Sequence, residues 1–319
     1  MNDILPSVKY VVDNSRKVKI IFNKINELVS KVDKDDLKIS ELNLSKYRWS
    51  FETLVQIIFV FNTINYCYWA KKGKGKWTVE FEGVKLDGAI ALFRCIEEEV
   101  KRNSDFLCGD ELADLSRINL KRILKGNVQI PLFEERLKCL NEVGKILEKK
   151  FENSFFSIYK QSENDAIKMV SLLIANFPNV RDESNFKGKI AAFYKRAQLN
   201  SRMISDLLIA NGKKELNNLD KLSAFADYKI PQKLRSLGIL EYTNDLANKI
   251  DNFELIEANS EDEVEIRANM IWGIELIRIQ LLKKYPFATS SHIDSMLWNM
   301  SQTKKEGEKP YHRTLTTAY

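Results

Sequence analysis

The spacing of apolar residues predicts helices along most of this chain. In residues 6–32, valine, isoleucine, leucine and phenylalanine recur every three or four positions, which is the spacing of one buried helix face. Residues 50–69 are apolar on nearly all sides and predict a helix that is buried all round. Similar spacing predicts further helices at residues 85–102, 110–125, 131–152, 163–176, 186–210, 231–238, 262–284 and 290–302.

One short segment has a different period. Trp77, Val79 and Phe81 alternate with polar residues, which is typical of a β-strand, and glycines just before them interrupt the helical pattern. The chain shows neither a fixed-period repeat nor a low-complexity linker. The pattern as a whole predicts an all-α fold, mainly helical with one small β hairpin, in a single domain that spans residues 1–319.

The composition is that of a globular protein with a mild positive charge. Hydrophobic residues make up 44% of the 319 residues, which is enough for a sizeable core. The net charge is +6, because 50 lysines and arginines are interspersed with 44 aspartates and glutamates. Proteins that coat nucleic acid usually gather more positive charge on one face, whereas a small anionic substrate needs only a few cations. The charge therefore disfavours direct nucleic-acid binding.

Potential metal ligands and targeting signals are scarce. The four cysteines contain no C-x-x-C pair, and only two histidines could join them as ligands. The N-terminal segment MNDILPSVKY lacks the apolar core of a secretory signal, and no uncharged apolar run is long enough to span a membrane. Nucleotide-loop, zinc-protease and serine-hydrolase motifs are also absent. We therefore expect a soluble cytoplasmic protein with free thiols, no metal, no cofactor and no membrane contact.

The segment AFADYKIPQKL at residues 224–234 brings a carboxylate into a loop. Pro231 disfavours a helical conformation at the residue before it, so a helix should restart near Pro231. Asp227 then lies in a short loop between Phe225 and Tyr228, where a partly desolvated carboxylate could act as a catalytic acid or stabilise a cation. The alternative is that Asp227 caps the helix that begins near Pro231.

A second carboxylate lies in the long helix predicted at residues 262–284. Trp272 and Glu275 share one mainly apolar face of this helix. A carboxylate in such a place needs a partner, which could be Arg278 or a cationic group of a bound substrate.

A third carboxylate lies in the helix predicted at residues 290–302. Asp294 and Trp298 are one turn apart and could together hold a flat polar ring by hydrogen bonding and stacking. The alternative is a core tryptophan with a surface aspartate.

Candidate anion-binding groups lie in two places. The last segment, KPYHRTLTTAY, has no helical period but contains His312 and Arg313, so it is either disordered or folded back as an anion clamp. In the helix predicted at residues 186–210, Lys195 and Arg196 adjoin apolar residues. One of these two cations must lie near the apolar face, where it would pair with an acid or a phosphate.

Six segments resemble the queuosine salvage proteins, the queuosine 5′-phosphate N-glycosylase/hydrolase family. They occur in the family's order and run from about residue 50 to the end of the chain. The matching segments are FNTINYCYW (61–69), FYKRAQ (193–198), LSAFADYKIPQKLRSLGIL (222–240), EIRANMIWGIEL (265–276), HIDSMLW (292–298) and YHRTLTTAY (311–319).

The resemblance implies an all-α fold similar to helix-hairpin-helix DNA glycosylases. It also implies an enzyme that releases queuine from queuosine 5′-phosphate and leaves ribose 5-phosphate, so that queuine can be reinserted into transfer RNA. By the same resemblance Asp227 is the catalytic residue, Phe225 contacts the base, and a second acidic helix contributes Asp294, Ser295 and Asn299. The expected substrate-binding residues are Phe225, Tyr228, Trp272, Glu275, Asp294, Ser295, Trp298 and Asn299, with Lys195, His312 and Arg313 as candidates for the phosphate.

The residues suit this chemistry. Cleavage of a ribosyl C1′–N bond builds oxocarbenium character on the sugar, which a carboxylate can stabilise or capture. Queuine is a 7-deaza base whose carbon at position 7 cannot be protonated, so a buried acid would have to assist at another atom. The expected partner is a small nucleotide, and the sequence makes no prediction of oligomeric state. The alternatives are a glycosylase that flips a base out of nucleic acid and a non-catalytic helical nucleotide-binding protein.

Overall fold

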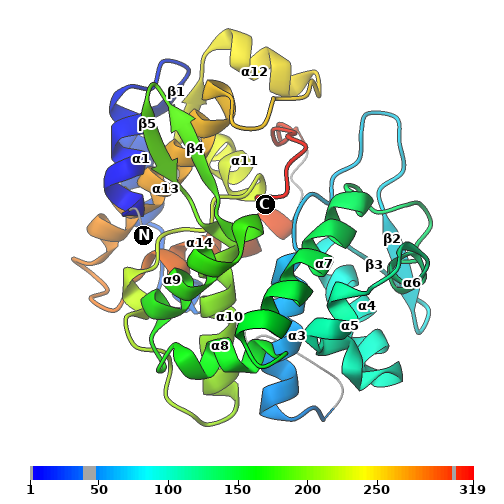
Figure 1. Ribbon diagram of the computed structural model, residues 1–319. Coiled ribbons are helices and arrows are strands. Elements are labelled where there is room, and N and C mark those ends of the chain that lie inside the picture. The colour runs from blue at the N-terminus through cyan, green and yellow to red at the C-terminus, as the bar shows by residue number, and fades with distance from the viewer. Residues whose placement is uncertain (1–2, 39–47, 304–306) are drawn as a thin grey trace. The chain divides into compact units, whose positions relative to one another are not determined.

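The computed structural model describes residues 3–38, 48–303 and 307–319, and most of these residues are helical (Figure 1). By their internal contacts they form two compact units, each assembled from segments that are far apart in the sequence. Unit 1 comprises Met1–Glu41, Asp182–Gln198 and Asp220–Leu315. Unit 2 comprises Leu42–Arg181, Leu199–Leu219 and Thr316–Tyr319.

Unit 1 contains the elements at both ends of the chain. Its helices are α1 (Ile4–Asp13), α2 (Phe22–Val29), α11 (Lys229–Ser236), α12 (Asn244–Asp251), α13 (Glu261–Leu281), α14 (Ser290–Gln302), the first turn of α10 (Lys195–Ala210) and the 3₁₀ turn η1 (Asp35–Leu37). Its strands are β1 (Val18–Ile20), β4 (Glu183–Phe186), β5 (Lys189–Ala192) and β6 (Leu240–Tyr242).

Unit 2 holds most of the remaining helices. They are α3 (Phe51–Thr63), α4 (Gly88–Arg102), α5 (Gly109–Ala113), α6 (Arg117–Ile123), α7 (Phe133–Lys150), α8 (Phe155–Gln161), α9 (Ala166–Asn176), the rest of α10 and the 3₁₀ turns η2 (Ser104–Leu107) and η3 (Pro178–Val180). The 3₁₀ turn η4 (Leu219–Lys221) lies at the point where the chain passes from unit 2 back to unit 1. The strands of unit 2 are β2 (Thr78–Phe81) and β3 (Val84–Asp87).

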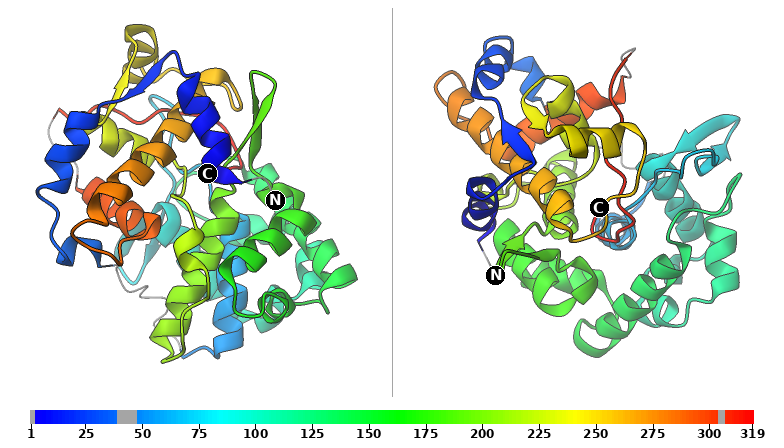
Figure 2. Two further views of the ribbon diagram at one scale, coloured as in Figure 1. Left: turned by 90° about the vertical axis from the view of Figure 1, so that its left-hand side faces the viewer. Right: turned by 90° about the horizontal axis from the view of Figure 1, so that it is seen from above.

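Helix α13 is the centre of unit 1. It packs against α1, α2, α11 and α14 (Figure 2, α13 in orange), and it is buried along most of its length, as its apolar pattern predicts. The side chain of Ser260 accepts a hydrogen bond from the Glu263 N–H and caps the helix, and the first turn is acidic, which suits the positive end of the helix dipole. Several charged side chains of this helix are nevertheless buried, and each of them needs a polar or charged partner.

Glu265 shows how such a partner is supplied. Its buried carboxylate accepts hydrogen bonds from the backbone N–H groups of Arg16, Lys17 and Val18, at 2.7–3.2 Å. These three residues link α1 to β1, so Glu265 attaches the N-terminal segment to the central helix. The contact spans 247 to 249 positions of sequence, which is why no local pattern indicates it.

We expect Glu265→Gln to lower the free energy of unfolding by about 3 kcal/mol or more, because three backbone N–H groups lose the charged form of a buried acceptor. Urea denaturation measures this loss. Glu254, which is exposed, supplies the matched control Glu254→Gln. Equal denaturation midpoints for the two variants would contradict the assigned role of Glu265.

The strands correct the expectation of a single hairpin. The hairpin at residues 77–81 is confirmed as β2–β3, but the described residues contain two more antiparallel pairs, β4–β5 and β1–β6. The β4–β5 hairpin turns at Lys187 and Gly188, both with positive φ, and the Asn185 side chain accepts a hydrogen bond from the Gly188 N–H. This turn delays the helix predicted at residues 186–210, which begins at Lys195. The pair β1–β6 joins segments more than 200 residues apart.

The helix predicted at residues 50–69 ends early, at Thr63. The buried guanidinium of Arg136 on α7 donates to the backbone carbonyls of Ile64, Tyr66 and Cys67 and lies over the Tyr66 ring, 4.4 Å from its centroid. These carbonyls therefore find a partner without a helix. Their partner comes from another element of unit 2, so the apolar pattern alone could not indicate where α3 ends.

Candidate functional site

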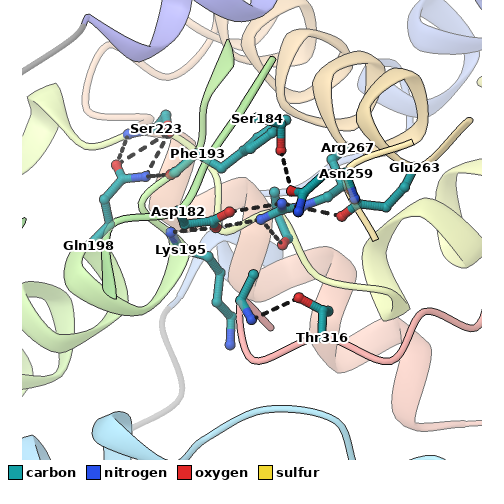
Figure 3. Close-up of polar contacts among 12 residues, drawn as sticks. Asp182, Ser184, Phe193, Lys195, Gln198, Ser223, Asn259, Glu263, Arg267 and Thr316 are labelled. Carbon is teal, nitrogen blue, oxygen red and sulfur yellow. Dashed lines mark hydrogen bonds and ion pairs between the residues drawn. The ribbon is translucent and has the colours of Figure 1, made fainter. Parts of the chain in front are cut away.

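The loop that precedes α11 is held in place by polar contacts within unit 1. The Ser223 N–H donates to Gln198 Oε1 at 2.8 Å, and Gln198 Nε2 donates to Ser223 Oγ at 3.0 Å and to the Phe193 carbonyl at 2.9 Å (Figure 3). Gln198 lies in the first turn of α10, so the loop and the start of α10 are tied together. This tie fixes the backbone from which Phe225 and Asp227 project.

Asp227 caps α11 with one oxygen and presents the other. Its Oδ1 accepts hydrogen bonds from the N–H groups of Lys229 and Ile230, both at 2.9 Å, so the capping interpretation is confirmed as geometry. Among the residues that the structure describes, Oδ2 receives no hydrogen bond, and the side chain is partly exposed. A cap of this kind orients a carboxylate without using both of its oxygens.

A buried lysine lies close to this carboxylate. Lys195 is the first residue of α10, is only 8% exposed, and donates its backbone N–H to Asp182 Oδ2 at 3.4 Å. Burial lowers the pKa of Lys195 to about 8, and the carboxylates of Asp227, Asp294 and Asp182 oppose that fall. An ammonium within electrostatic reach of two further carboxyls can hold one of them in the charged form.

Asp294 on α14 is the second carboxyl of the site. It is buried, and its Oδ2 accepts a hydrogen bond from the Phe225 N–H at 2.9 Å. Burial, together with the nearby charge of Asp227, raises the pKa of Asp294 to about 8. The Asp294 carboxyl is therefore mostly protonated at neutral pH.

The two carboxyls differ in their surroundings. Burial also raises the pKa of Asp227 above its ordinary value, but Lys195 and the two N–H groups of α11 oppose this rise. Asp294 has one N–H donor and is more deeply buried. The charged form of Asp227 is thus favoured by two N–H donors and Lys195, whereas Asp294 has one N–H donor and is next to the Asp227 charge, an arrangement that suits a base or nucleophile beside an acid.

Asp182 and Arg267 form a buried ion pair next to these residues. Arg267 of α13 makes two hydrogen bonds to the Asp182 carboxylate and lies over the Phe193 ring, 4.0 Å from its centroid (Figure 3). Neither Asp182 nor Arg267 stood out from the sequence. The one available signal was an arginine in the middle of a helix that is apolar nearly all round.

Comparison with known proteins identifies the family. The family model described as queuosine salvage protein matches residues 45–319. A protein of Sphaerobacter thermophilus named queuosine 5′-phosphate N-glycosylase/hydrolase is 35% identical over 271 residues, 84% of this chain and 82% of that protein. A Bos taurus protein of the same name is 32% identical, over 98% of this chain and 97% of its own length.

The chain belongs to the queuosine salvage protein family. The matched region includes every residue singled out above as a candidate for the site, from Lys195 to Arg313. The resemblance inferred from the six segments is therefore confirmed.

Not every candidate residue of the queuosine salvage family member faces this cluster. Glu275 is paired with Arg278 on its own helix, at 2.6 and 2.8 Å, so the structural interpretation of Glu275 is confirmed. Trp272 lies under the Lys9 ammonium of α1, 5.5 Å from its ring centroid. Trp272 thus contacts Lys9, whereas Glu275 contacts Arg278 and accepts a hydrogen bond from Ser290 Oγ at 3.5 Å.

On α14 the alternative of a core tryptophan with a surface aspartate is wrong. Asp294 is buried, whereas Trp298 is 38% exposed. Ser295 is half-buried and Asn299 is exposed. The helix thus carries one buried acid, with Trp298 on its more open side.

The C-terminal residues 311–315 are ordered parts of unit 1, so the interpretation of this segment as disordered is wrong. The Tyr311 ring packs on the ring of Tyr228, with centroids 4.8 Å apart, and the Arg313 guanidinium lies over the Phe253 ring. His312 is buried, and burial with the Arg267 charge lowers its pKa to about 3. As a neutral imidazole it can offer a phosphate a hydrogen bond rather than a positive charge.

The part of the chain that the structure describes also lacks two features. No group of three or more His, Cys, Asp or Glu side chains there could hold a metal ion. No helix in the same part of the chain is long and apolar enough to cross a membrane.

Proposed function

We propose that this protein hydrolyses the N-glycosidic bond of queuosine 5′-phosphate, releasing queuine and ribose 5-phosphate for the salvage of queuine into transfer RNA. The observation that carries the proposal is the Asp227 carboxylate, which is held by the N-terminus of α11 with one oxygen left for a substrate. The names of the relatives, queuosine 5′-phosphate N-glycosylase/hydrolase, support the substrate and the reaction.

Asp227 would act at the sugar. As the C1′–N bond lengthens, positive charge develops on C1′ and the ring oxygen. A carboxylate with a free Oδ2 next to C1′ would stabilise this charge by electrostatic attraction, and the partly desolvated setting strengthens that attraction. Lys195 supports this role because its ammonium favours the ionised form of Asp227 before the substrate is bound.

Asp294 would act at the base. The bonding electrons leave with queuine, and the leaving base needs a proton at an atom other than carbon 7. A carboxyl with a pKa of about 8 still holds its proton at neutral pH and can donate it. Water then adds to C1′ and returns a proton to the Asp294 carboxylate, which restores the starting state and balances the hydrolysis.

The remaining parts of this proposal concern recognition and context. Phe225, Tyr228, Ser295, Trp298 and Asn299 lie on the two segments that carry the carboxyls and are the candidates for the base. For the phosphate the candidates remain Lys195 and Arg313 as cations, and His312 as a neutral hydrogen-bond partner. We also propose that the protein is a single domain with a likeness to helix-hairpin-helix glycosylases and that it is cytoplasmic. Its substrate would be a free nucleotide rather than nucleic acid.

The decisive experiment compares substrates. Purified protein is incubated with queuosine 5′-phosphate, queuosine, guanosine 5′-phosphate and queuosine-containing transfer RNA, and free base is measured by liquid chromatography and mass spectrometry. We expect queuine to be released fastest from the 5′-phosphate, with a lower kcat on the nucleoside, because binding energy from the phosphate is used at the reacting centre. Equal rates on nucleoside and nucleotide would contradict the phosphate preference, and release from transfer RNA alone would favour a base-flipping glycosylase.

A further inference from the structure

One buried ion pair, Asp182–Arg267, contacts both the backbone before Asp227 and the start of α10. The guanidinium of Arg267 is 1% exposed, and its Nη1 and Nη2 donate to Asp182 Oδ1 at 2.9 Å and Oδ2 at 2.5 Å. Nη2 also donates to the carbonyl of Ala226 at 3.4 Å, and Ala226 is the residue directly before Asp227. Arg267 thus reaches the backbone that carries the candidate catalytic carboxylate.

Asp182 contacts the start of α10. Its Oδ2 accepts the backbone N–H of Lys195 at 3.4 Å, and its backbone carbonyl accepts the N–H of Phe193 at 2.9 Å. The Phe193 ring in turn lies under the Arg267 guanidinium. The start of α10, which places Lys195, is therefore held by the same ion pair that holds Ala226.

The rest of the network keeps Arg267 in position. Glu263, one turn earlier on α13, accepts from Arg267 Nη1 at 3.3 Å and from the Asn259 N–H at 3.0 Å. Asn259 Oδ1 accepts from Ser184 Oγ at 2.8 Å, which extends the network to strand β4 (Figure 3). The planar guanidinium suits this arrangement because it can bond two oxygens of one carboxylate and further acceptors at the same time.

We infer that Asp182 and Arg267 are positioning residues, which set the distance between the Asp227 carboxylate and the Lys195 ammonium and so keep Asp227 ready for the reaction. This inference rests on the proposed function. Asp182 bonds the backbone N–H of Lys195, and Arg267 bonds the backbone carbonyl of Ala226. Their effect passes through the backbone of Ala226 and Lys195, where a displacement of about 1 Å is enough to lower a rate by about a hundredfold.

The competing explanation is that the ion pair only stabilises the fold. Two variants distinguish this explanation from a positioning role. Arg267→Lys keeps the charge but cannot bond both Asp182 oxygens and the Ala226 carbonyl together. We expect its kcat on queuosine 5′-phosphate to fall about tenfold or more, with a smaller change in KM. The matched control is Arg278→Lys, which alters another arginine–carboxylate pair of the same helix, and we expect it to retain wild-type kcat.

Asp182→Asn gives a readout that a structural role would not change. The groups whose charges act on Lys195 are Asp227, Asp294, Asp182 and Arg196, and Asp182 is one of the three acids that favour its charged form. Removal of that acid should shift the alkaline fall of kcat to lower pH. Lysine-selective NMR, with Lys195→Arg to assign the signal, should show the same shift in the titration of Lys195 without any substrate.

The outcomes are distinct. An inactive wild-type protein on queuosine 5′-phosphate would refute the proposed function, and the NMR titration would then decide the positioning role by itself. An active wild type, with folded Arg267→Lys at full kcat and an unshifted Lys195 titration in Asp182→Asn, would overturn the inference. If Arg267→Lys does not fold, the titration in Asp182→Asn decides, and an unchanged Lys195 again overturns it.

Discussion

Replacement of Asp227 by asparagine should lower turnover of queuosine 5′-phosphate by about a thousandfold or more while the protein remains folded. The change is nearly isosteric, and the amide oxygen can still accept from the N–H groups of Lys229 and Ile230. Asparagine caps helices about as well as aspartate, so α11 should keep its start. What disappears is the negative charge that faces the developing oxocarbenium ion. In a partly desolvated site that charge is worth about 4 kcal/mol, which corresponds to about a thousandfold in rate.

The measurement pairs single-turnover rates with urea denaturation of the same preparation. The loss of the Asp227 charge should also lower the pKa of Asp294, because that charge is one of the two causes that raise it. As the pH rises, the residual activity of Asp227→Asn should therefore begin to decline at a lower pH than wild-type activity does. Turnover above about a tenth of the wild-type value, a loss of less than about 1.4 kcal/mol, would show that Asp227 is only a helix cap.

Asp294→Asn should lower turnover by about a hundredfold or more, because asparagine cannot donate an acidic proton to the leaving base. Its side-chain oxygen can still accept from the Phe225 N–H, so the local backbone should stay in place. The defect should depend on the leaving group. With p-nitrophenyl riboside 5-phosphate, whose leaving group needs no proton, Asp294→Asn should be nearly as active as wild type and Asp227→Asn should stay inactive. Equal defects of Asp294→Asn on both substrates would contradict its role as the acid.

The pH dependence follows from the same carboxyl. The pKa of Asp294 is raised from its ordinary value to about 8, so the acid is present below pH 8 and is lost as the pH rises through that value. Wild-type turnover should therefore fall above about pH 8, where Lys195 also loses its proton. On the acid side turnover falls as Asp227 is protonated, and it does so above the ordinary aspartate range because burial raises the pKa of Asp227.

Stability changes with pH in the direction that this shift requires. The folded state holds the Asp294 proton more tightly than the unfolded state, so this group's contribution to stability is present below the ordinary pKa and is lost as the pH rises towards 8. Asp294→Asn removes that dependence. The free energy of unfolding of the variant, relative to that of wild type, should therefore be at least as high at pH 8 as at pH 4. Loss of folding then cannot account for the lower turnover.

Much of the secondary structure and the centre of the site follow from the sequence alone. The apolar spacing determines that α13 and α14 are helices, because burial of one or all faces leaves a period that can be read locally. Pro231 predicts a helix start nearby, and α11 does begin just after Asp227, at Lys229. The expectation that Pro231 keeps Ile230 out of the helix is wrong, because Ile230 is part of α11. The six family segments indicate the family, which the family match confirms, and the proposed role of Asp227 follows from that resemblance.

The tertiary structure alone decided what each of these groups faces. Periodicity shows which side of a helix is buried but not which distant segment covers it, so the pair β1–β6, the early end of α3 and the partners of Glu265 were outside its reach. For the same reason the sequence could indicate Arg278, on the same helix, as a partner of Glu275, but not Lys9 of α1 as the contact of Trp272.

Protonation was decided in the same way. Asp227 and Asp294 are both aspartates in the sequence, and only burial and neighbouring charges distinguish the pKa of one from that of the other. His312 stays neutral because burial and the Arg267 charge oppose its protonation. The free energy of a charge depends on the solvent and charges around it, and residues from α10, α11, α13 and α14 meet there only when the chain is folded.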